Sequence, residues 1–262
     1  MTIFFSDNEK NSDWAIAEYP SNTEYCIFVL NKKKTPQPMA IQKSSFDFLK
    51  KIQKNNNKEW FTKNKSLYLE AKADMESYID AVNTELSKTD EIEKAKLYRI
   101  YRDVRFSKDK TPYKSHFALS LTRATAYRRG GYFIRLAPGA SFVGGGFYSP
   151  DASDLKHIRQ QIAADSTPLR KILKSKKFKD TFGELMGDKL KTSPKGFDKD
   201  HPDIDLLRYK SFYTFHNFSD SEVLSPNFVK ETVKVLKAIR PYFDYMSDIL
   251  THDLNGISLL DK

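Results

Sequence analysis

The chain contains a single cysteine, Cys26, among its 262 residues. One thiol cannot build a disulfide framework or a cysteine-based metal cluster, and a lone cysteine is typical of a reducing compartment. Long apolar runs are also missing: the longest, Tyr25 to Leu30, is far shorter than the roughly 20 residues that a membrane-spanning helix needs. The N-terminus has no basic segment followed by an apolar one, so no secretion signal is predicted. We expect a cytoplasmic protein without a membrane partner.

The sequence shows little sign of disorder or repetition. Hydrophobic residues make up 39% and aromatic residues 13% of the chain. This supplies enough apolar surface to offset the entropy lost on folding. We find no internal repeat and no low-complexity tract. The length suits one large domain or two small ones with a substantial core.

Positive charge is in excess, and it is concentrated in one segment. The net charge is +10. Residues 94–135 contain twelve Lys or Arg and two Asp, whereas the rest of the chain has 32 basic and 32 acidic residues. Folding can therefore gather the excess into one positive face.

The first 40 residues differ from the rest. Residues 14–19 and 24–31 have the pattern of two short strands joined by the turn-like "PSNT". The polar, proline-containing stretch "NKKKTPQPM" follows and resembles a linker. We therefore predict a β-hairpin extension with a linker over residues 1–40, and a separate domain over 41–262.

Helical periodicity dominates the next segment. Ser44 or Ser45 can cap a short helix, which the three asparagines at 55–57 should end. Apolar residues then recur at helical spacing from about 58 to 86, which predicts one long helix with a core-facing stripe.

The period changes to two in the middle of the chain. Residues 97–106 fit a strand, although a helix beginning at Glu91 is an alternative. Segments 116–123, 131–139 and 140–150 are clearer strands. Together they predict an antiparallel sheet of three or four strands.

The C-terminal half is largely helical. Ser225 and Pro226 should start a helix that runs to about 250 and that Pro241 kinks or divides. The other expected elements are a helix starting at Ser149–Pro150 and ending near 164, short helices over 166–173 and 177–187, and a strand over 210–218. Helices flanking a central antiparallel sheet predict the α+β class.

Four ordered motifs resemble a family of bacterial and fungal proteins catalogued as domain of unknown function 2461. They are "FLKKIQKNNNKEWFTKNKSLY", "YRDVRFSKDKTPYKSHF", "LAPGASFVGGGFYSP" and "GFDKDHPDIDLLRYKSF". The resemblance covers about residues 41–255. It implies one α+β domain and supplies no reaction, cofactor or substrate. Residues matching the second motif are Arg102, Asp103, Arg105, Phe106, Asp109, Lys110, Pro112, Tyr113 and Lys114.

The second motif is the strongest candidate for ligand binding. Arginine presents a planar fork that suits phosphate or carboxylate, and lysine adds a compact charge. The candidate ligand-binding residues are Arg102, Arg105, Lys108, Lys110, Tyr113 and Lys114. The alternative is structural: Asp103 and Asp109 pair with neighbouring basic residues and brace the loop.

The glycine-rich segment 139–146 is a second candidate. Gly144, Gly145 and Gly146 permit close approach by a ligand or by another chain segment. The alternative is a bulge or a strand bend. The segment has neither the Walker pattern nor the dinucleotide pattern. We expect a basic pocket between residues 102–114 and 139–146.

Residues suited to proton transfer are few. The tentative catalytic candidates are His201, Asp103 and His116. The stretch "DKDHPDIDLL" combines His201 with four aspartates and could bind a divalent ion, but aspartates before a helix are more often caps, and no metal site is predicted. No serine or cysteine nucleophile signature is present. Whether the protein is an enzyme stays open.

The sequence therefore predicts a protein that binds a phosphate- or carboxylate-bearing ligand. A nucleic-acid-binding protein is an alternative, because eight aromatic residues are interleaved with the basic ones between Tyr98 and Phe133. In alternating strands, half of such aromatics face the core. A scaffold for an acidic partner is the third possibility. Nothing in the sequence identifies a cofactor or an oligomeric state.

Overall fold

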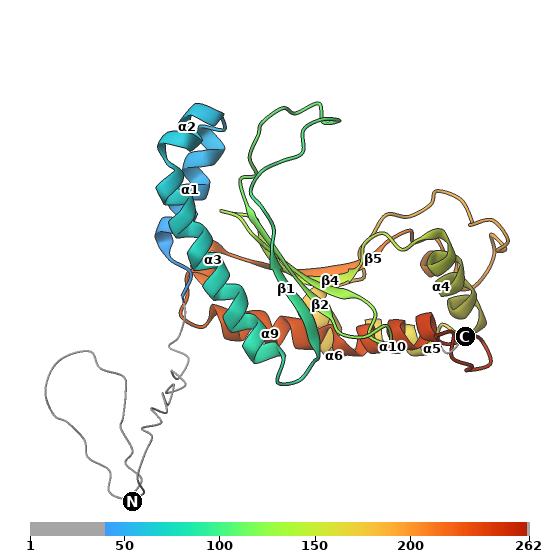
Figure 1. Cartoon of the computed structure of the whole chain (residues 1–262). Helices are drawn as coiled ribbons and strands as arrows, with labels where there is room; N and C mark the ends of the chain where they lie inside the picture. The colour runs from blue at the N-terminus through green and yellow to red at the C-terminus, as the bar shows by residue number, and fades with distance from the viewer. Residues whose placement is uncertain (1–39, 261–262) are drawn as a thin grey trace, which may run out of the picture. The chain divides into compact units, whose positions relative to one another are not determined.

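Alternating apolar residues build a five-stranded antiparallel sheet at the centre of the protein (Figure 1). The structure is a computed structural model and describes residues 40–260. The strands follow one another in chain order across the sheet, so each pairs with its sequence neighbour. They are β1 (Ile92–Leu97), β2 (Phe117–Arg123), β3 (Gly131–Leu136), β4 (Ser141–Phe147) and β5 (Phe212–Phe218).

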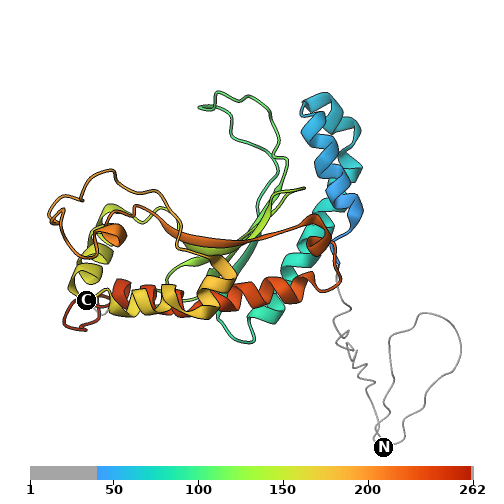
Figure 2. The ribbon, with the colours of Figure 1, turned by 180° about the vertical axis from the view of Figure 1, so that it is seen from behind.

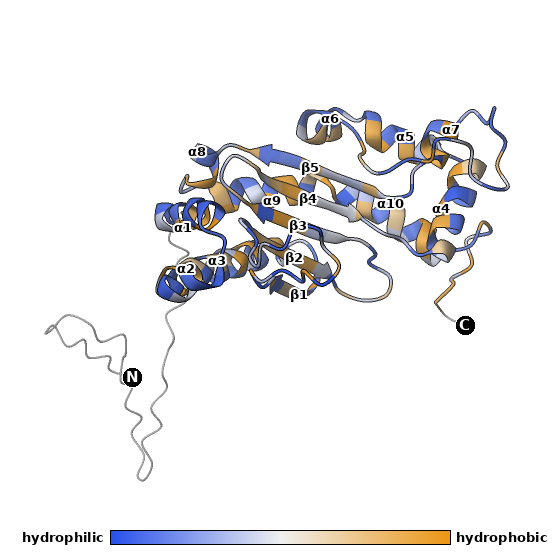
Figure 3. Cartoon of the chain, turned by 90° about the horizontal axis from the view of Figure 1, so that it is seen from above, coloured by the Kyte–Doolittle hydropathy of each residue, from blue (hydrophilic) through white to orange (hydrophobic). Residues whose placement is uncertain are grey.

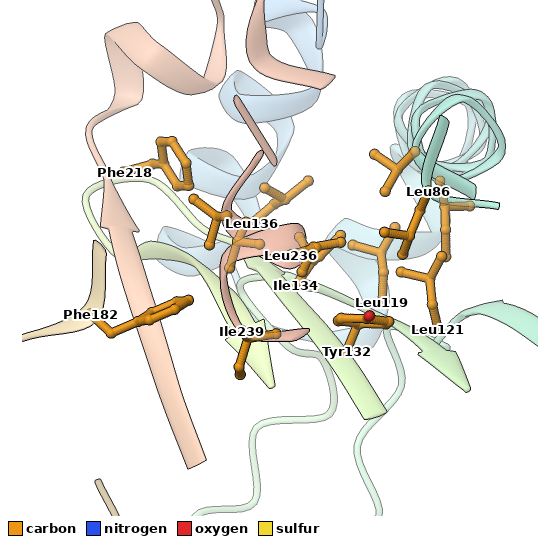
Figure 4. Close-up of a cluster of buried hydrophobic side chains, with 14 of the residues drawn as sticks. Leu86, Leu119, Leu121, Tyr132, Ile134, Leu136, Phe182, Phe218, Leu236 and Ile239 are labelled. Carbon is orange, nitrogen blue, oxygen red and sulfur yellow. The ribbon is translucent and has the colours of Figure 1, made fainter. Parts of the chain in front are cut away.

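One face of the sheet forms the core. Along β3, Tyr132, Ile134 and Leu136 are buried, and the residues between them are half-buried. Because side chains alternate along a strand, the two sets lie on opposite faces. Figure 4 shows how the core-facing residues of β2 and β3 meet Leu86 and Leu236 from the helices below.

Helices cover only the core face. Residues Lys65–Leu86 form α3, which packs against β1 and β2. Residues Phe228–Ala238 form α9 and pack against β4, and Lys176–Phe182 form α6 and pack against β5. Figure 2 shows α9 and α10 running beneath the sheet. The remaining helices are α1 (Lys43–Lys54), α2 (Lys58–Lys63), α4 (Ala152–Ala164), α5 (Thr167–Lys174), α7 (Ile204–Leu207), α8 (Asp220–Val223) and α10 (Arg240–Thr251).

The long helix predicted over 58–86 is divided. Asn64 leaves the helical conformation, with φ −112° and ψ 24°, and its side-chain amide donates to the carbonyl of Trp60. Asparagine competes for backbone groups in this way, which ends α2 and allows α3 to begin. The predicted serine cap of α1 is also wrong. Ser45 is buried and donates to Asp74, and no side chain caps that helix.

The middle of the chain differs most from expectation. The first strand spans 92–97 rather than 97–106, and the alternative helix from Glu91 does not form. Residues 98–116 instead form a long connection between β1 and β2, which we call the arm. It stands clear of the sheet on the side opposite α9 (Figures 1 and 2).

The C-terminal half follows the prediction more closely. Pro241 lies in the first turn of α10, and the predicted helix is divided there into α9 and α10. Helix α4 ends at Ala164 as expected, but its cap is Asp151 and not Ser149. The α+β class is confirmed, with five strands rather than three or four because β5 joins the same sheet.

Two further predictions concern the N-terminal hairpin and membrane-spanning helices. The predicted hairpin over 14–31 lies outside the described residues. Between residues 40 and 260, no helix is long and apolar enough to cross a membrane.

Candidate functional site

The arm is held firmly at its base. The ring of Tyr113 stacks on Phe61 of α2 with centroids 4.0 Å apart, and Tyr101 packs against both rings. The Asn56 side chain accepts from the backbone N–H of Tyr113 at 3.0 Å and donates to its carbonyl at 2.8 Å. Tyr113, a predicted ligand residue, is therefore buried and acts as the anchor of the arm.

Arg102 braces the interior of the arm. Its guanidinium donates to the carboxylate of Asp109 and to Thr111. Hydrogen bonds from the backbone and hydroxyl of Thr111, and then from Arg102, lower the pKa of Asp109 to about 2. The structural alternative for this motif predicted that Asp109 pairs with a neighbouring basic residue, and that ion pair is present. The guanidinium of Arg102 is therefore occupied by contacts within the arm.

The outer part of the arm is exposed. Arg105 pairs with Asp103 through a contact of 2.7 Å at the surface. Lys110 donates to the carbonyls of Val104 and Arg105. Phe106, at the tip, is 97% exposed. Exposed ion pairs exchange readily with other partners, so Arg105 and Lys110 stay available to a ligand in a way that Arg102 does not.

The glycine segment lies away from the arm. Strand β3 separates β4 from β2, and Gly144 lies level with Ser120, four residues beyond His116. Gly144 is thus about 10 Å across the sheet and about 13 Å along it from the base of the arm. The structure does not bring residues 102–114 and Gly144–Gly146 together into one pocket.

The glycines have a structural reason of their own. A Cβ on Gly144 would lie 2.6 Å from Cα of Phe215, and one on Gly145 would lie 2.9 Å from the ring of Phe243. Gly146 also meets the backbone of β5, and its φ of 149° is unfavourable for other residues. The close approach that these glycines permit is to neighbouring segments of the chain.

The uncovered side of the sheet is the most distinctive surface. Figure 3 views it from above, with α9 and α10 behind the strands. Register places fifteen residues on this side: Lys94, Lys96, Tyr98, Ala118, Ser120, Thr122, Gly131, Phe133, Arg135, Phe142, Gly144, Gly146, Tyr213, Phe215 and Asn217. We call this set the open face. It has three cations, five aromatic residues and no carboxylate.

The cations of segment 94–135 divide into two groups. Five arginines pair with carboxylates: Arg102, Arg105, Arg123, Arg128 and Arg129. Seven others have no carboxylate within ion-pair distance among residues 40–260: Lys94, Lys96, Arg99, Lys108, Lys110, Lys114 and Arg135. All seven lie on the open face or in the arm. The cations of this segment that lack a carboxylate partner are therefore on one side of the sheet.

Arg135 is the centre of this positive region. Its Nε is buried without a hydrogen-bond partner in the described structure. His116 lies nearby, where burial, then Arg135 and then Lys114, lower its pKa to about 4. Burial and Arg99 also lower the pKa of Lys114. Arg135 and Lys114 thus place two positive charges beside a partly buried imidazole, and a bound anion would interact favourably with both.

The sequence motif did not point to Arg135, Lys94 or Lys96. Their signal was the alternation itself, because Arg135 occupies a position between the buried residues Ile134 and Leu136. That alternation predicts that Arg135 lies on the face of the strand opposite the core. Nothing local indicates that helices leave this side bare.

The three candidate catalytic residues do not form one group: two lie in the arm and the third lies before α7. Asp103 is in the outer part of the arm, where it pairs with Arg105, His116 is the last residue of the arm before β2, and His201 is in the connection before α7. The Nδ1 of His201 accepts from the backbone N–H of Asp203, whose carboxylate in turn binds Ser166 and Arg170. These contacts build a structured turn. Within residues 40–260, no group of three or more His, Cys, Asp and Glu side chains could hold a metal ion.

A cavity of about 630 Å³ lies elsewhere, between α6, α8, α9 and β5. His216 lines it and has Nδ1 2.8 Å from the carbonyl of Thr181. Its charged residues include Asp180, Glu222 and Glu231, and Glu231 pairs with Lys234. This lining does not favour an anion, in contrast to the open face.

Comparison with known proteins gives a family and nothing beyond it. No curated protein and no solved structure matches the chain significantly. The model of a family described as conserved hypothetical protein (DUF2461) matches residues 44–245, which include the arm and all five strands. The chain therefore belongs to this family, domain of unknown function 2461.

Proposed function

We propose that the open face and the arm bind a phosphate- or carboxylate-bearing ligand. The observation that carries the proposal is the group formed by Arg135, His116 and Lys114. It combines a guanidinium whose buried Nε has no hydrogen-bond partner among the described residues with an imidazole whose pKa is lowered to about 4. A buried polar group without a partner costs about 1 to 3 kcal/mol, so its retention calls for an explanation. A bound oxyanion supplies one.

The open face suits an anion in its overall charge as well. No carboxylate occupies its fifteen positions, and the six cations other than Arg135 that lack a carboxylate partner lie on β1 or in the arm, on the same side of the sheet. An anion approaching this side meets a potential of one sign, which raises its association rate. Because His201 belongs to the turn before α7 and not to the open face or the arm, the proposal is for binding and includes no reaction. A cytoplasmic location stays a prediction that rests on the lone Cys26.

A ligand panel tests the proposal. We would measure thermal shift and calorimetric binding with inorganic phosphate, pyrophosphate, nucleotides, sugar phosphates and citrate, for the wild type and for Arg135→Gln and Lys114→Gln. A ligand that binds only the folded state raises the melting temperature. We expect at least one anion to bind and each variant to lower its affinity about tenfold, which is about 1.4 kcal/mol.

Lys230→Gln is the matched control. Lys230 is exposed on α9, on the covered side of the sheet, so its replacement removes the same charge elsewhere. Equal losses in Lys230→Gln and Arg135→Gln would mean that binding follows net charge and not the open face. Absence of binding by every anion in the panel would also contradict the proposal.

A further inference from the structure

We propose that the anion bound by the open face is a single-stranded nucleic acid, an inference that rests on the proposed function. The open face is divided into two bands. Unpaired lysines lie on β1 and in the arm, and aromatic rings lie on β3, β4 and β5, with Arg135 between them. A strand of nucleic acid has the same division, with phosphates along one side and bases along the other.

The aromatic band is continuous. Centroid distances are 6.0 Å from Phe133 to Phe142, 4.4 Å from Phe142 to Phe215, and 5.2 Å from Phe215 to Tyr213. Tyr148, which is 76% exposed, extends the band at 5.6 Å from Tyr213. Rings on an uncovered sheet face offer bases a surface to stack on, at about 1 to 3 kcal/mol per base.

The cationic band lies on β1 and in the arm, and β2 separates it from the aromatic band. The Nζ of Lys96 lies 4.8 Å from the ring centroid of Tyr98, and that of Lys114 lies 5.9 Å from it. Lys94 lies two residues further along β1 on the same face. Positive charges therefore follow the edge strand and continue into the arm. Such a row can contact successive phosphates of one strand.

The extent of the charge favours a polyanion over a small ligand. The seven unpaired cations span from β3 to the outer part of the arm, and one phosphate group cannot contact them all. The aromatic band favours an unpaired strand over a duplex, because bases within a duplex are already stacked on each other. Both observations together indicate a single strand of several nucleotides.

The arm adds an exposed ring to the site. Phe106 is 97% exposed at the tip, and the guanidinium of Arg105 lies 5.9 Å from its centroid. Lys108 and Lys110 flank it in the sequence. A large apolar side chain in water contributes nothing to the core. Phe106 is close in sequence to the three cations Arg105, Lys108 and Lys110, so its ring can contact a base while the cations bind the phosphates.

Fluorescence anisotropy with labelled oligothymidylate and oligouridylate tests the inference. We would compare lengths of about one, four, eight and twelve nucleotides at low salt, since site sizes of ~4–16 nucleotides are usual for such faces. Affinity should rise with length, fall with salt at a log-log slope near −0.7 per phosphate contact, and exceed that for the matching duplex by about tenfold or more.

Variants assign the binding to the face. Phe215→Leu should weaken the twelve-nucleotide strand about tenfold, whereas Phe215→Tyr, which keeps a ring, should bind as the wild type does. Arg105→Gln with Lys110→Gln should leave the melting temperature unchanged and make the salt slope shallower. Phe106→Leu serves as a second variant that cannot disturb the core, because its side chain is exposed.

The outcomes separate the two proposals. If pyrophosphate or a nucleotide binds in an Arg135-dependent way but longer strands gain nothing, the nucleic-acid inference is wrong and the proposed function stands. Equal affinity for duplex and single strand would also overturn the inference. If neither small anions nor oligonucleotides bind, both proposals are wrong.

Discussion

The guanidinium carbon of Arg135 lies 5.9 Å from the ring centroid of Phe142 on the adjacent strand, on the side of the sheet that no helix covers. Arg123, one strand away, has the opposite environment. It faces the core, and its Nε donates at 2.9 Å to Asp90, which is fully buried. One sheet thus holds a paired, buried arginine on its core face and, toward the opposite end of the neighbouring strand, an arginine whose Nε lacks a partner among the described residues.

This contrast predicts opposite effects of the same substitution. Arg135→Met should leave the free energy of unfolding unchanged or raise it by up to about 1 kcal/mol, because an unsatisfied buried group is removed. Arg123→Met should lower it by about 3 to 5 kcal/mol, because Asp90 loses a buried partner. Urea unfolding of both variants measures the difference. A loss above about 1 kcal/mol in Arg135→Met would show that Arg135 is structural.

His116 predicts a dependence of stability on pH. Its pKa is lowered from 6.5 in the unfolded chain to about 4 in the fold, so the unfolded state binds more protons between these values. Stability from the neutral imidazole is therefore complete above about pH 6.5 and is lost as the pH falls toward 4. Full burial would make this loss about 3 kcal/mol. Partial solvent screening makes it smaller.

The measurement is the difference in unfolding free energy between wild type and His116→Gln from pH 7 to pH 4. Glutamine does not titrate, so the wild type should lose stability relative to the variant as the pH falls. A constant difference across this range would mean that the imidazole is not held in a positive, partly buried environment.

Arg102 predicts an effect on the arm alone. In Arg102→Gln the contacts to Asp109 and Thr111 are lost, but the base of the arm keeps Tyr113 and Asn56. We expect trypsin to cut after Lys108 and Lys110, sites that this variant and its control both keep, several times faster, while the melting temperature changes little. Arg105→Gln is the control, because its ion pair is exposed and worth about 0 to 1 kcal/mol. Equal cleavage rates in the two variants would contradict a bracing role.

Gly144 predicts a packing defect. Gly144→Ala places a methyl group against the backbone of β5, 2.6 Å from Cα of Phe215, so the two strands must separate. We expect a loss of about 2 kcal/mol or more in the free energy of unfolding, comparable with overpacking elsewhere. Gly131→Ala is a control with a nearest contact of 3.7 Å. Unchanged stability in Gly144→Ala would leave a ligand as the reason for this glycine.

Removal of residues 1–38 should leave a folded domain. The described residues contain all five strands and their helices, and the family match begins at residue 44. We expect one cooperative thermal transition in the truncated chain. A broad or absent transition would show that the N-terminal segment belongs to the core.

The sequence by itself determined the local elements and the location of the charge. The patterns of 116–123 and 131–139 identified two strands, and Pro241 marked the division between α9 and α10. The excess of cations in segment 94–135 needed only counting. These features depend on neighbouring residues, so a local pattern is sufficient to predict them.

Only the tertiary structure decided which residues share a surface. Strand β5 pairs with β4 although some 65 residues separate them, and this pairing completes the aromatic band with Phe142 and Phe215. The pairing of β2, β3 and β4 places Gly144 away from the arm, and contacts within the arm turn Arg102 toward Asp109 as a brace. Strand pairing and helix coverage are long-range contacts that a local pattern does not encode. For that reason the charge was visible in the sequence, but the face that presents it was not.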